Sequence, residues 1–421
     1  MLLVTSGSMG DVAPFTGLGV RLRDAGHDVT VATHAPFADT ITGCGLPFRV
    51  IPGDLRAILP QAHGQDGSRS GTGPSALVNL LRLAHPLIAE LATGVAAAAE
   101  QTRPDVMLLS TLVAPLGYQV AEAAGVPWAG VFLQPVTPTG AFGSVLLGGR
   151  SIGAPGNRLL TAAALTVSQS LYARPVRELR AALGLPRRSV RTLRRRQENR
   201  FPTFHGFSPS VVPRPADWPA SHLVTGYWWP QRPVGWQPPA ALADFLADGP
   251  PPVFVGFGSM ATDSGARLAG PVLAAVRAAG LRAVVQAGWA GLRVDPAAAG
   301  PDVLGIGEVP HDWLFPRMAA VVHHGGAGTT AAGLRAGVPA VVVPVLADQP
   351  FWARRLHRLE VAPPPLPLPA LTADRLAAAL RQAVGNPRHR ARAQALAGRL
   401  AAEDGAAPVL RWLQSPHLPT G

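Results

Sequence analysis

The segment VVHHGGAGTT at positions 321–330 places two imidazoles, several glycines and two hydroxyls between an apolar run and a helix-forming run. In α/β proteins, ligands bind beyond the carboxyl ends of parallel strands, where such a segment would lie. Free amides at the start of the following helix, together with the helix dipole, favour a phosphate group. We therefore predict a diphosphate-binding cradle in which the ring of His324 donates an N–H. A glycine-rich turn that only packs a helix against a sheet would also fit the segment.

The predicted cradle consists of residues that offer backbone amides or hydroxyl groups: Gly325, Gly326, Ala327, Gly328, Thr329 and Thr330. A competing interpretation rests on the same glycines. Gly326-x-Gly328-x-x-Ala331 fits the dinucleotide fingerprint G-x-G-x-x-A. Asp348 follows about twenty residues later, at the end of the next apolar run, where a ribose-binding acid belongs. Spacing alone therefore also allows an NAD(P)-dependent oxidoreductase.

Two series of apolar strands alternating with helices surround these residues. The first runs from LLVTSG to VPWAGVFLQP and the second from PVFVGFGSM to PAVVVPVLADQ, which predicts an α/β fold with two doubly wound parallel sheets. Residues 213–239 hold seven prolines and four tryptophans, which disfavour helix and regular sheet. We expect an N-terminal domain at 1–212, a linker at 213–239, a C-terminal domain at 240–405 and a helical tail at 406–421.

Composition and charge limit the class of protein. The 421 residues contain one cysteine, Cys44, and no run of eighteen apolar residues, and the N-terminus has no basic region before an apolar core. We therefore expect a cytoplasmic protein without disulfides. The net charge is +12, and residues 174–200 hold ten arginines against two glutamates. This stretch fits either a solvated helical face or a contact with an anionic membrane, whereas the lack of interleaved aromatics argues against nucleic acid.

The stretch from Glu308 to Leu356 resembles the donor-binding signature of nucleotide-sugar glycosyltransferases (family 1, the UDP-glycosyltransferase superfamily). It is most similar to the branch of sterol glucosyltransferases and bacterial enzymes that glycosylate glycopeptide and polyketide antibiotics. TSGSMGDVAPF at the N-terminus resembles the GSxGDVxP loop of that family, and GFGSM, AGW and VTGYWWP follow in the family order. The resemblance covers nearly the whole chain. It implies a GT-B fold, with two Rossmann-like domains facing a cleft and a C-terminal helix that returns to the N-terminal domain.

The resemblance also implies roles for individual residues. His324 would bind the donor phosphates, and Asp348 and Gln349 would hold hydroxyls of the sugar, although Asp348 also suits a helix cap. Asp11 follows the first strand in the turn GDVAP and would be the general base that activates the acceptor hydroxyl. Its alternative role is that of a helix N-cap. His323 is expected to face the core.

Other donor contacts are expected near the base, the ribose and the phosphates, from Gly258, Ser259, Trp289, Val309 and His311. Trp289 and His311 are equally compatible with plain packing. The chain has no D-x-D pair, so we expect a metal-independent reaction with a UDP-sugar or TDP-sugar as co-substrate and no other cofactor. Single displacement would invert the anomeric configuration. Met9 stands where the family often has arginine, which bears on the pKa of the base and on the acceptor.

The acceptor site is expected in the first domain, in a lining of small and apolar side chains that includes Thr111, Phe132, Gln134, Pro135 and Phe142, with the loop 54–75. Such a lining suits a bulky lipophilic acceptor such as a polyketide macrocycle, a sterol or another terpenoid. The protein would act as a monomer or homodimer. A non-catalytic partner of a biosynthetic assembly remains an alternative, against which the intact Asp11, His324 and Asp348 argue.

Overall fold

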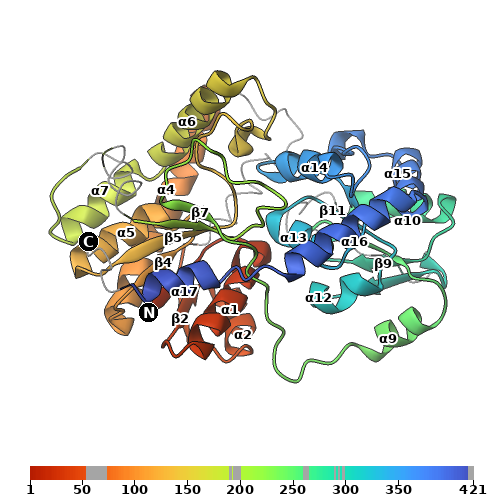
Figure 1. Cartoon of the computed structure of the whole chain (residues 1–421), viewed down its shortest axis with the longest axis horizontal. Coiled ribbons are helices and arrows are strands. Elements are labelled where there is room, and N and C mark those ends of the chain that lie inside the picture. Colours follow the sequence, from red (N-terminus) through yellow and green to blue (C-terminus); the bar gives the residue numbers. More distant parts are fainter. Residues whose placement is uncertain are drawn as a thin grey trace. The chain divides into compact units, whose positions relative to one another are not determined.

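The computed structural model describes residues 1–53, 74–188, 192, 201–258, 265–288, 291–292, 294–295 and 299–415, with the side chains of 74–84 and 265–266 left out. Within these ranges the chain forms two compact units (Figure 1). The first unit comprises Met1–Leu146, Ser151–Val234 and Asp404–Gly421, and the second comprises Leu147–Arg150 and Gly235–Glu403. Ser259, Trp289, loop residues 54–73 and most of 189–200 lie outside the described residues, so their expected roles stay predictions.

The first unit is built on a seven-stranded parallel sheet in the order β3-β2-β1-β4-β5-β6-β7. Its strands are β1 (Leu2–Val4), β2 (Thr30–Thr33), β3 (Phe48–Val50), β4 (Met107–Leu109), β5 (Trp128–Phe132), β6 (Thr203–His205) and β7 (His222–Val224). Its helices are α1 (Met9–Asp24), α2 (Ala38–Thr42), α4 (Pro74–Thr102), α5 (Ala114–Ala124), α6 (Ala154–Ser170), α7 (Ala173–Ala182) and α17 (Ala407–Leu413).

The second unit has a five-stranded parallel sheet in the order β10-β9-β8-β11-β12. Its strands are β8 (Val253–Gly256), β9 (Ala283–Gln286), β10 (Val303–Ile306), β11 (Ala320–His323) and β12 (Ala340–Val342). Its helices are α9 (Ala240–Ala247), α10 (Gly265–Ala278), α12 (His311–Leu314), α13 (Ala327–Arg335), α14 (Gln349–Arg358), α15 (Ala373–Gly385) and α16 (Pro387–Ala401).

Short 3-10 turns occur in both units, at Ala35–Phe37, Val145–Leu147, Phe315–Arg317 and Leu368–Ala370.

Both sheets are covered by apolar side chains on their two faces. Successive residues of a strand point to opposite faces, and in β1 Leu2 and Val4 join one buried cluster while Leu3 joins another. In β8, Val253 and Val255 likewise belong to one buried cluster and Phe254 to another. This arrangement explains why the strands read as continuous apolar runs, as is typical of parallel sheets enclosed by helices. The α/β, doubly wound fold class is confirmed.

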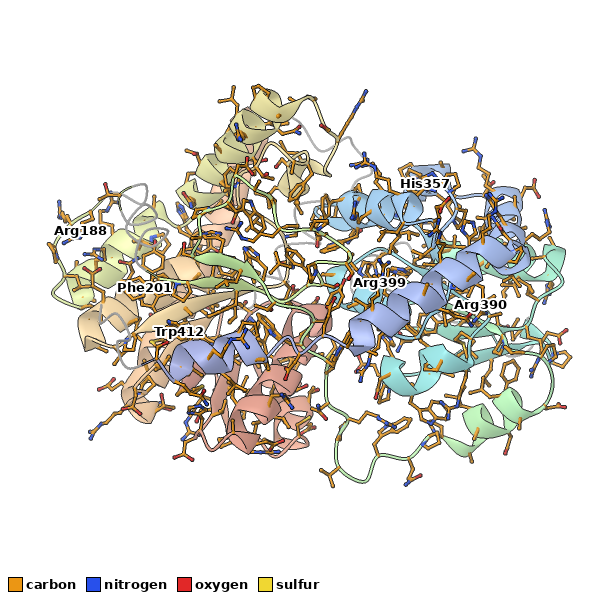
Figure 2. The ribbon with its side chains drawn as sticks, in the orientation of Figure 1. Arg188, Phe201, His357, Arg390, Arg399 and Trp412 are labelled. Carbon is orange, nitrogen blue, oxygen red and sulfur yellow. The ribbon has the colours of Figure 1, made fainter. Side chains whose placement is uncertain are left out.

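The C-terminal helix α17 belongs to the first unit. Its Trp412, labelled in Figure 2, packs against Phe204 of β6 with ring centroids 5.9 Å apart. Just before this helix, the carbonyl of Gly405 accepts a hydrogen bond from Nε1 of Trp228 over 2.9 Å. The expected return of the last helix to the N-terminal domain is therefore seen in the structure.

The proline-rich stretch 213–239 is more ordered than its composition predicts. It contains β7, which completes the first sheet, and buries the indoles of Trp218 and Trp228, each less than 5% exposed. The expectation that this stretch resists regular sheet was wrong. The reason is that its prolines flank the strand without entering it, and β7 is an edge strand.

The described arginines of the basic stretch 174–200 do not form one solvated face. Arg180 is 1% exposed, and its guanidinium pairs with Glu122 at 2.7 Å, contacts the side-chain oxygen of Gln119, and donates from Nε to the carbonyl of Pro186. Arg174 pairs with Glu178 on the surface of α7. The charge of Arg180 is therefore part of the folded interior, and the charge of Arg174 is offset by Glu178.

Candidate active site

The candidate residues gather at the centre of each sheet, where the strand order reverses. In the first sheet Asp11 follows β1 and Thr111 follows the neighbouring β4. In the second sheet Gly258 follows β8 and His324 follows the neighbouring β11. The carboxyl ends of the two strands at such a reversal are the usual ligand sites of open α/β sheets. Each unit therefore carries its candidate residues where this fold binds ligands.

Asp11 lies in the first turn of α1, not in the turn between strand and helix that the sequence suggested. The helix begins at Met9 with Ser8 as its N-cap, and Asp11 is the third helical residue. Both the backbone N–H and the hydroxyl of Ser8 donate to Oδ2 of Asp11, each over 2.9 Å. The hydrogen bond from the Ser8 amide to the Asp11 carboxylate is the one that a capping box with the spacing Ser-x-x-Asp makes. Asp11 is thus a capping-box residue, and its second carboxylate oxygen is still available for other partners.

The second carboxylate oxygen of Asp11 meets two residues that were predicted to contact the acceptor. Nε2 of Gln134 donates to Oδ1 of Asp11 over 3.2 Å, and Oγ1 of Thr111 donates to Oε1 of Gln134 over 3.3 Å. Burial raises the pKa of Asp11 above its ordinary value, while the hydrogen bonds from Ser8 and Gln134 act to lower it. A carboxylate with a raised pKa can accept a proton from an alcohol.

Gly7 makes room for this carboxylate. Its φ is +133°, and a Cβ on Gly7 would lie 2.6 Å from Oδ2 of Asp11. The preceding Ser6 is anchored by a 2.7 Å hydrogen bond between its hydroxyl and Nε2 of His34, whose Nδ1 faces the carbonyl of Ile51 at 3.0 Å. The segment from β1 to α1 is therefore fixed on both sides of Gly7, which holds the position of Asp11.

Phe132 and Phe142, two further predicted acceptor residues, belong to a row of aromatic rings. Phe132 meets His205 edge to face at 6.0 Å, His205 stacks on Trp218 at 4.5 Å, and Trp218 meets Phe142 at 6.5 Å. Pro135 is buried and Phe132 is only 9% exposed. The sequence did not single out His205 or Trp218, because their contact joins β6 to a loop in the proline-rich stretch.

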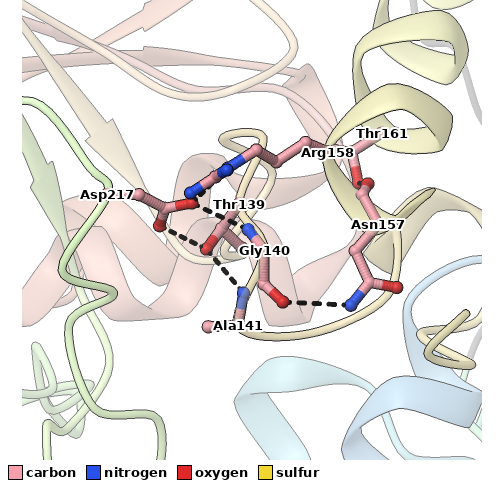
Figure 3. A network of polar contacts seen from close by, with 7 residues as sticks. All are labelled: Thr139, Gly140, Ala141, Asn157, Arg158, Thr161 and Asp217. Carbon is pink, nitrogen blue, oxygen red and sulfur yellow. Dashed lines mark hydrogen bonds and ion pairs between the residues drawn. The ribbon is translucent and has the colours of Figure 1, made fainter. Parts of the chain in front are cut away.

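Asp217 fixes the loop that carries Phe142 (Figure 3). Its carboxylate accepts hydrogen bonds from Oγ1 of Thr139 at 2.6 Å, from the amide of Gly140 at 2.8 Å and from Nε of Arg158 in α6 at 2.7 Å. Burial acts to raise the pKa of Asp217, but these hydrogen bonds outweigh it and lower the pKa to about 2. Asp217 is therefore a permanent anion that ties α6 to the segment before Phe142.

In the second unit, the glycine-rich segment opens α13. Gly326 is the N-cap of this nine-residue helix, so the amides of the first turn have no partner within the helix. Gly325 has φ +91°, and a Cβ there would lie 2.9 Å from Cγ1 of Val342 and 3.1 Å from the carbonyl of Gln349. The hydroxyl-bearing residues differ in exposure, because Thr330 is 1% exposed whereas Thr329 is partly exposed. Thr329 is therefore the better placed of the two predicted hydroxyl donors.

The ring of His324 lies between two glycines. A Cβ on Gly258, whose φ is +61°, would lie 2.8 Å from Cε1 of His324, and a Cβ on Gly326 would lie 2.5 Å from its Nε2. Burial lowers the pKa of His324 to about 4, so the ring is neutral at pH 7. Its Nδ1 is buried and has no hydrogen-bond partner among the described residues. A neutral imidazole with one N–H fits a donor to a phosphate oxygen.

The other two histidines near this site are packed. His323 is fully buried, as expected, and its Nδ1 accepts the amide N–H of Gly325 over 3.1 Å. His311 stacks on Phe315 with ring centroids 4.2 Å apart. Burial, and to a smaller extent the nearby His324, lowers the pKa of His311 to about 4. Val309 is 5% exposed, so only its backbone fits the predicted role at the nucleobase.

Asp348 and Gln349 begin α14. Oδ2 of Asp348 accepts the indole N–H of Trp352 over 2.8 Å, and Asp348 is the helix N-cap. Gln349 is 3% exposed, and its Oε1 accepts the amides of Val345 and Leu346 over 2.8 and 3.1 Å. The predicted sugar contacts would therefore be made from side chains that the loop already holds in place.

The part of the chain that the structure describes contains neither a cluster of potential metal ligands nor a membrane-spanning helix. No group of three or more His, Cys, Asp or Glu side chains with metal-binding geometry occurs among those residues. No described helix is long and apolar enough to cross a bilayer.

Two doubly wound parallel sheets of this kind form the GT-B fold of glycosyltransferases. The structure is similar to the crystal structure of the glycotransferase of kitacinnamycin (TM-score 0.72, 22% identity, 99% of this chain and 98% of that chain). It is also similar to that of the Streptomyces sp. SF2575 glycosyltransferase SsfS6 complexed with thymidine diphosphate (TM-score 0.65, 24% identity, 98% and 99% of the two chains). At these identities the likeness establishes the fold.

Sequence comparison establishes the family. Residues 1–142 match the glycosyltransferase family 28 N-terminal domain, and residues 283–414 match the C-terminal domain of erythromycin biosynthesis protein CIII-like proteins. The chain is 38% identical over 411 residues to the O-mycaminosyltylonolide 6-deoxyallosyltransferase of Streptomyces fradiae, covering 96% of this chain and 94% of that protein. It is 32% identical over 435 residues to a sterol 3-beta-glucosyltransferase of Arabidopsis thaliana, covering 99% and 68%.

The chain therefore belongs to the glycosyltransferase family that contains these antibiotic-sugar and sterol glucosyltransferases, and it is a glycosyltransferase. The resemblance drawn from Glu308–Leu356 and from the N-terminal loop is confirmed. The family match replaces the alternative interpretation of Gly326, Gly328 and Asp348 as the dinucleotide site of an NAD(P)-dependent oxidoreductase.

Proposed function

We propose that the protein transfers a sugar from a UDP-sugar or TDP-sugar to a hydroxyl group of a bulky lipophilic acceptor, with inversion at the anomeric carbon. The acceptor class is a polyketide or macrolide, a sterol or another terpenoid. The names of the Streptomyces fradiae and Arabidopsis thaliana relatives support this range, since one acts on a tylonolide and the other on a sterol. A related fold complexed with thymidine diphosphate supports the donor class.

The position of His324 at the start of α13 is the observation that supports the donor assignment. The neutral ring is held between Gly258 and Gly326, beside a helix N-terminus whose amides lack helical partners. Negative charge develops on the diphosphate as it leaves, and fixed N–H dipoles stabilise such charge without reorganisation. In this proposal the amides of Gly326–Thr329 and the N–H of His324 bind the diphosphate, and Asp348 and Gln349 contact the sugar.

Asp11 is the proposed general base. Its carboxylate accepts the proton of the acceptor hydroxyl, and the oxygen forms a bond to the anomeric carbon. The bond from that carbon to the diphosphate oxygen breaks, and its electron pair leaves with the diphosphate. The raised pKa of Asp11 and its fixed position between Ser8 and Gln134 support this role.

Further parts of the proposal concern the setting of the reaction. We propose a metal-independent reaction in the cytoplasm, by a monomer or homodimer, with acceptor contacts from Thr111, Gln134 and Phe142. Peripheral contact with an anionic membrane through residues 174–200 would bring lipophilic acceptors within reach.

The donor is tested by a thermal-shift panel of uridine and thymidine diphosphates and their sugars, with NADH as a control. We expect a nucleoside diphosphate to raise the melting temperature and NADH to leave it unchanged. Mass spectrometry of lipophilic acceptors incubated with the best donor then identifies the product, and NMR of the product gives its anomeric configuration. Retention of the donor configuration would overturn the single-displacement mechanism.

A further inference from the structure

Three arginines of the second unit act on one another electrostatically and have no counter-ion among the described residues. Arg354 and Arg358 are one turn apart on α14, and Arg150 comes from the segment Leu147–Arg150 of the same unit. Among the described residues, none of the three guanidinium groups forms a hydrogen bond or ion pair. Burial, followed by the charges of Arg358 and Arg150, lowers the pKa of Arg354. Among the residues that the structure describes, no acidic side chain opposes this lowering.

Two glycines, Gly148 and Gly149, lie against α14 just before Arg150 in the chain. Gly148 and Gly149 have φ values of +78° and +76°. A Cβ on Gly149 would lie 2.6 Å from Cδ2 of Phe351, and a Cβ on Gly148 would lie 3.4 Å from Pro350 and 3.5 Å from Nη2 of Arg354. At Gly149 only glycine allows the backbone to approach the helix so closely, whereas the contacts at Gly148 are of ordinary length. The next residue, Arg150, is exposed, and its charge is one of those that lower the pKa of Arg354.

Arg354 also has a donor that solvent does not reach. Its Nε is buried and has no hydrogen-bond partner within the described part of the chain. A buried donor without a partner is costly, and the cost is greater for a charged group. Arg150 and Arg358 are exposed, so the cluster opens to solvent on one side. An oxyanion would reach the cluster from this exposed side and relieve the repulsion among the three cations.

We propose that Arg354, together with Arg150 and Arg358, binds an oxyanion of the phosphate or carboxylate class. This inference goes beyond the proposed function and does not depend on it, because none of the three arginines belongs to the diphosphate cradle. The site shares α14 with Asp348 and Gln349, which begin that helix. The anion is either inorganic phosphate or the carboxylate of a sugar acid, and the two sources are separated by experiment.

The experiment is calorimetric titration of the full chain with inorganic phosphate and, separately, with glucuronate. Three proteins are compared: the wild type, Arg354→Gln, and the control Arg388→Gln, which removes the same charge from an exposed position of α16. The proposed diphosphate cradle would also bind phosphate in all three proteins. Binding at the arginine cluster is therefore measured as the difference in affinity between the wild type and Arg354→Gln. We expect the Arg354 variant to bind at least one anion about tenfold more weakly, the loss of roughly one charge-assisted hydrogen bond. The control should bind like the wild type.

Arg150→Gln and Arg358→Gln provide a second route if Arg354→Gln does not fold. Both side chains are exposed, so their removal should leave folding intact and weaken binding of the same anion. Preference for phosphate or for glucuronate identifies the source. Equal binding of both anions by the wild type and the arginine-cluster variants would overturn the proposal, as would an equal loss in Arg388→Gln.

Discussion

Gln134 donates a hydrogen bond from Nε2 to Oδ1 of Asp11 over 3.2 Å, across 123 positions of the sequence. The amide of Gln134 is oriented in turn by Thr111, whose hydroxyl donates to Oε1. The proposed base is therefore held at both oxygens, by Ser8 at one and by Gln134 at the other. Gln134 and Thr111 were expected to contact only the acceptor. Gln134 also contacts the proposed base Asp11, and Thr111 orients Gln134.

Replacing Gln134 with leucine should raise the pKa of Asp11 further. The hydrogen bond from Gln134 favours the ionised carboxylate, and its loss favours the protonated form. Since only the ionised form can accept a proton, the acidic limb of the kcat/KM profile should move to higher pH. Thr111→Val, which keeps the donor to Asp11, should shift the limb less. A profile that scales down equally at every pH would show that Gln134 contacts only the acceptor.

Asp11→Asn should remove turnover while nucleotide binding persists. An amide cannot accept the acceptor proton, and loss of a general base typically costs about a hundredfold to ten-thousandfold in rate. Kinetics give the loss, and calorimetry with thymidine or uridine diphosphate gives the dissociation constant. Melting temperature controls for the capping box, because asparagine still accepts a hydrogen bond from Ser8. Near-normal turnover in a folded variant would exclude Asp11 as the base.

Gly7→Ala should reduce turnover more than its effect on stability explains. The new Cβ would lie 2.6 Å from Oδ2 of Asp11, so the carboxylate must move. Gly26→Ala is the matched control, because its φ of +93° imposes a similar backbone strain and nothing lies within 4 Å of the added Cβ. Gly26→Ala should lose about 1 kcal/mol of unfolding free energy, and Gly7→Ala should lose more, because its Cβ also displaces the carboxylate. Equal activity in the two variants would show that the room beside Gly7 is not needed for catalysis.

The fold was predictable from the sequence because strand and helix alternate strictly around apolar runs. All strands that contain a clear apolar run were found, and Gly325 and Gly326 were correctly placed at the start of a helix. Strands β3, β6 and β7 were missed because Arg49, His205 and His222 interrupt their apolar pattern. Their places in the sheet are fixed by neighbouring strands, which local patterns do not report.

The candidate site was predictable where its partners are close in the sequence. Ser8 and Asp11 have capping-box spacing, so this signal was present in the sequence although the helix was expected to begin later. The contact of Gln134 with Asp11 and the stacking of His205 on Trp218 join distant segments. Such contacts depend on strand order, and only the three-dimensional structure reveals them.

Gly326→Ala should weaken donor binding. The φ of Gly326 is −63°, so alanine is tolerated by the backbone, but its Cβ would lie 2.5 Å from Nε2 of His324 and displace the ring. We expect the dissociation constant for the nucleoside diphosphate to increase about tenfold, as for the loss of one hydrogen bond to a charged group. Gly333→Ala in the same helix adds a Cβ with nothing within 4 Å and should bind normally. Unchanged binding in Gly326→Ala would remove His324 from the cradle.

The free energy of unfolding should fall on acidification from about pH 6.5 to pH 4, the range set by the ordinary pKa of histidine and its lowered values here. Burial lowers the pKa of His222, His311 and His324 to about 4, so these rings are neutral when folded and protonated when unfolded. The unfolded state then binds more protons, and acid favours it. Burial also lowers the pKa of His205 and His323, which act in the same direction. Asp11 acts in the opposite direction because its pKa is raised, but it is one group against five histidines.

His311→Phe tests the contribution of one ring to this acid sensitivity. Phenylalanine keeps the stacking on Phe315 and removes the titrating group. Urea unfolding at several pH values should show a slope of free energy against pH that is smaller by up to about 1.4 kcal/mol per pH unit, the value for one proton. The variant should also be less acid-sensitive than the wild type between pH 6 and pH 5. An unchanged slope would mean that His311 is already protonated in the folded state, or that it is not buried there.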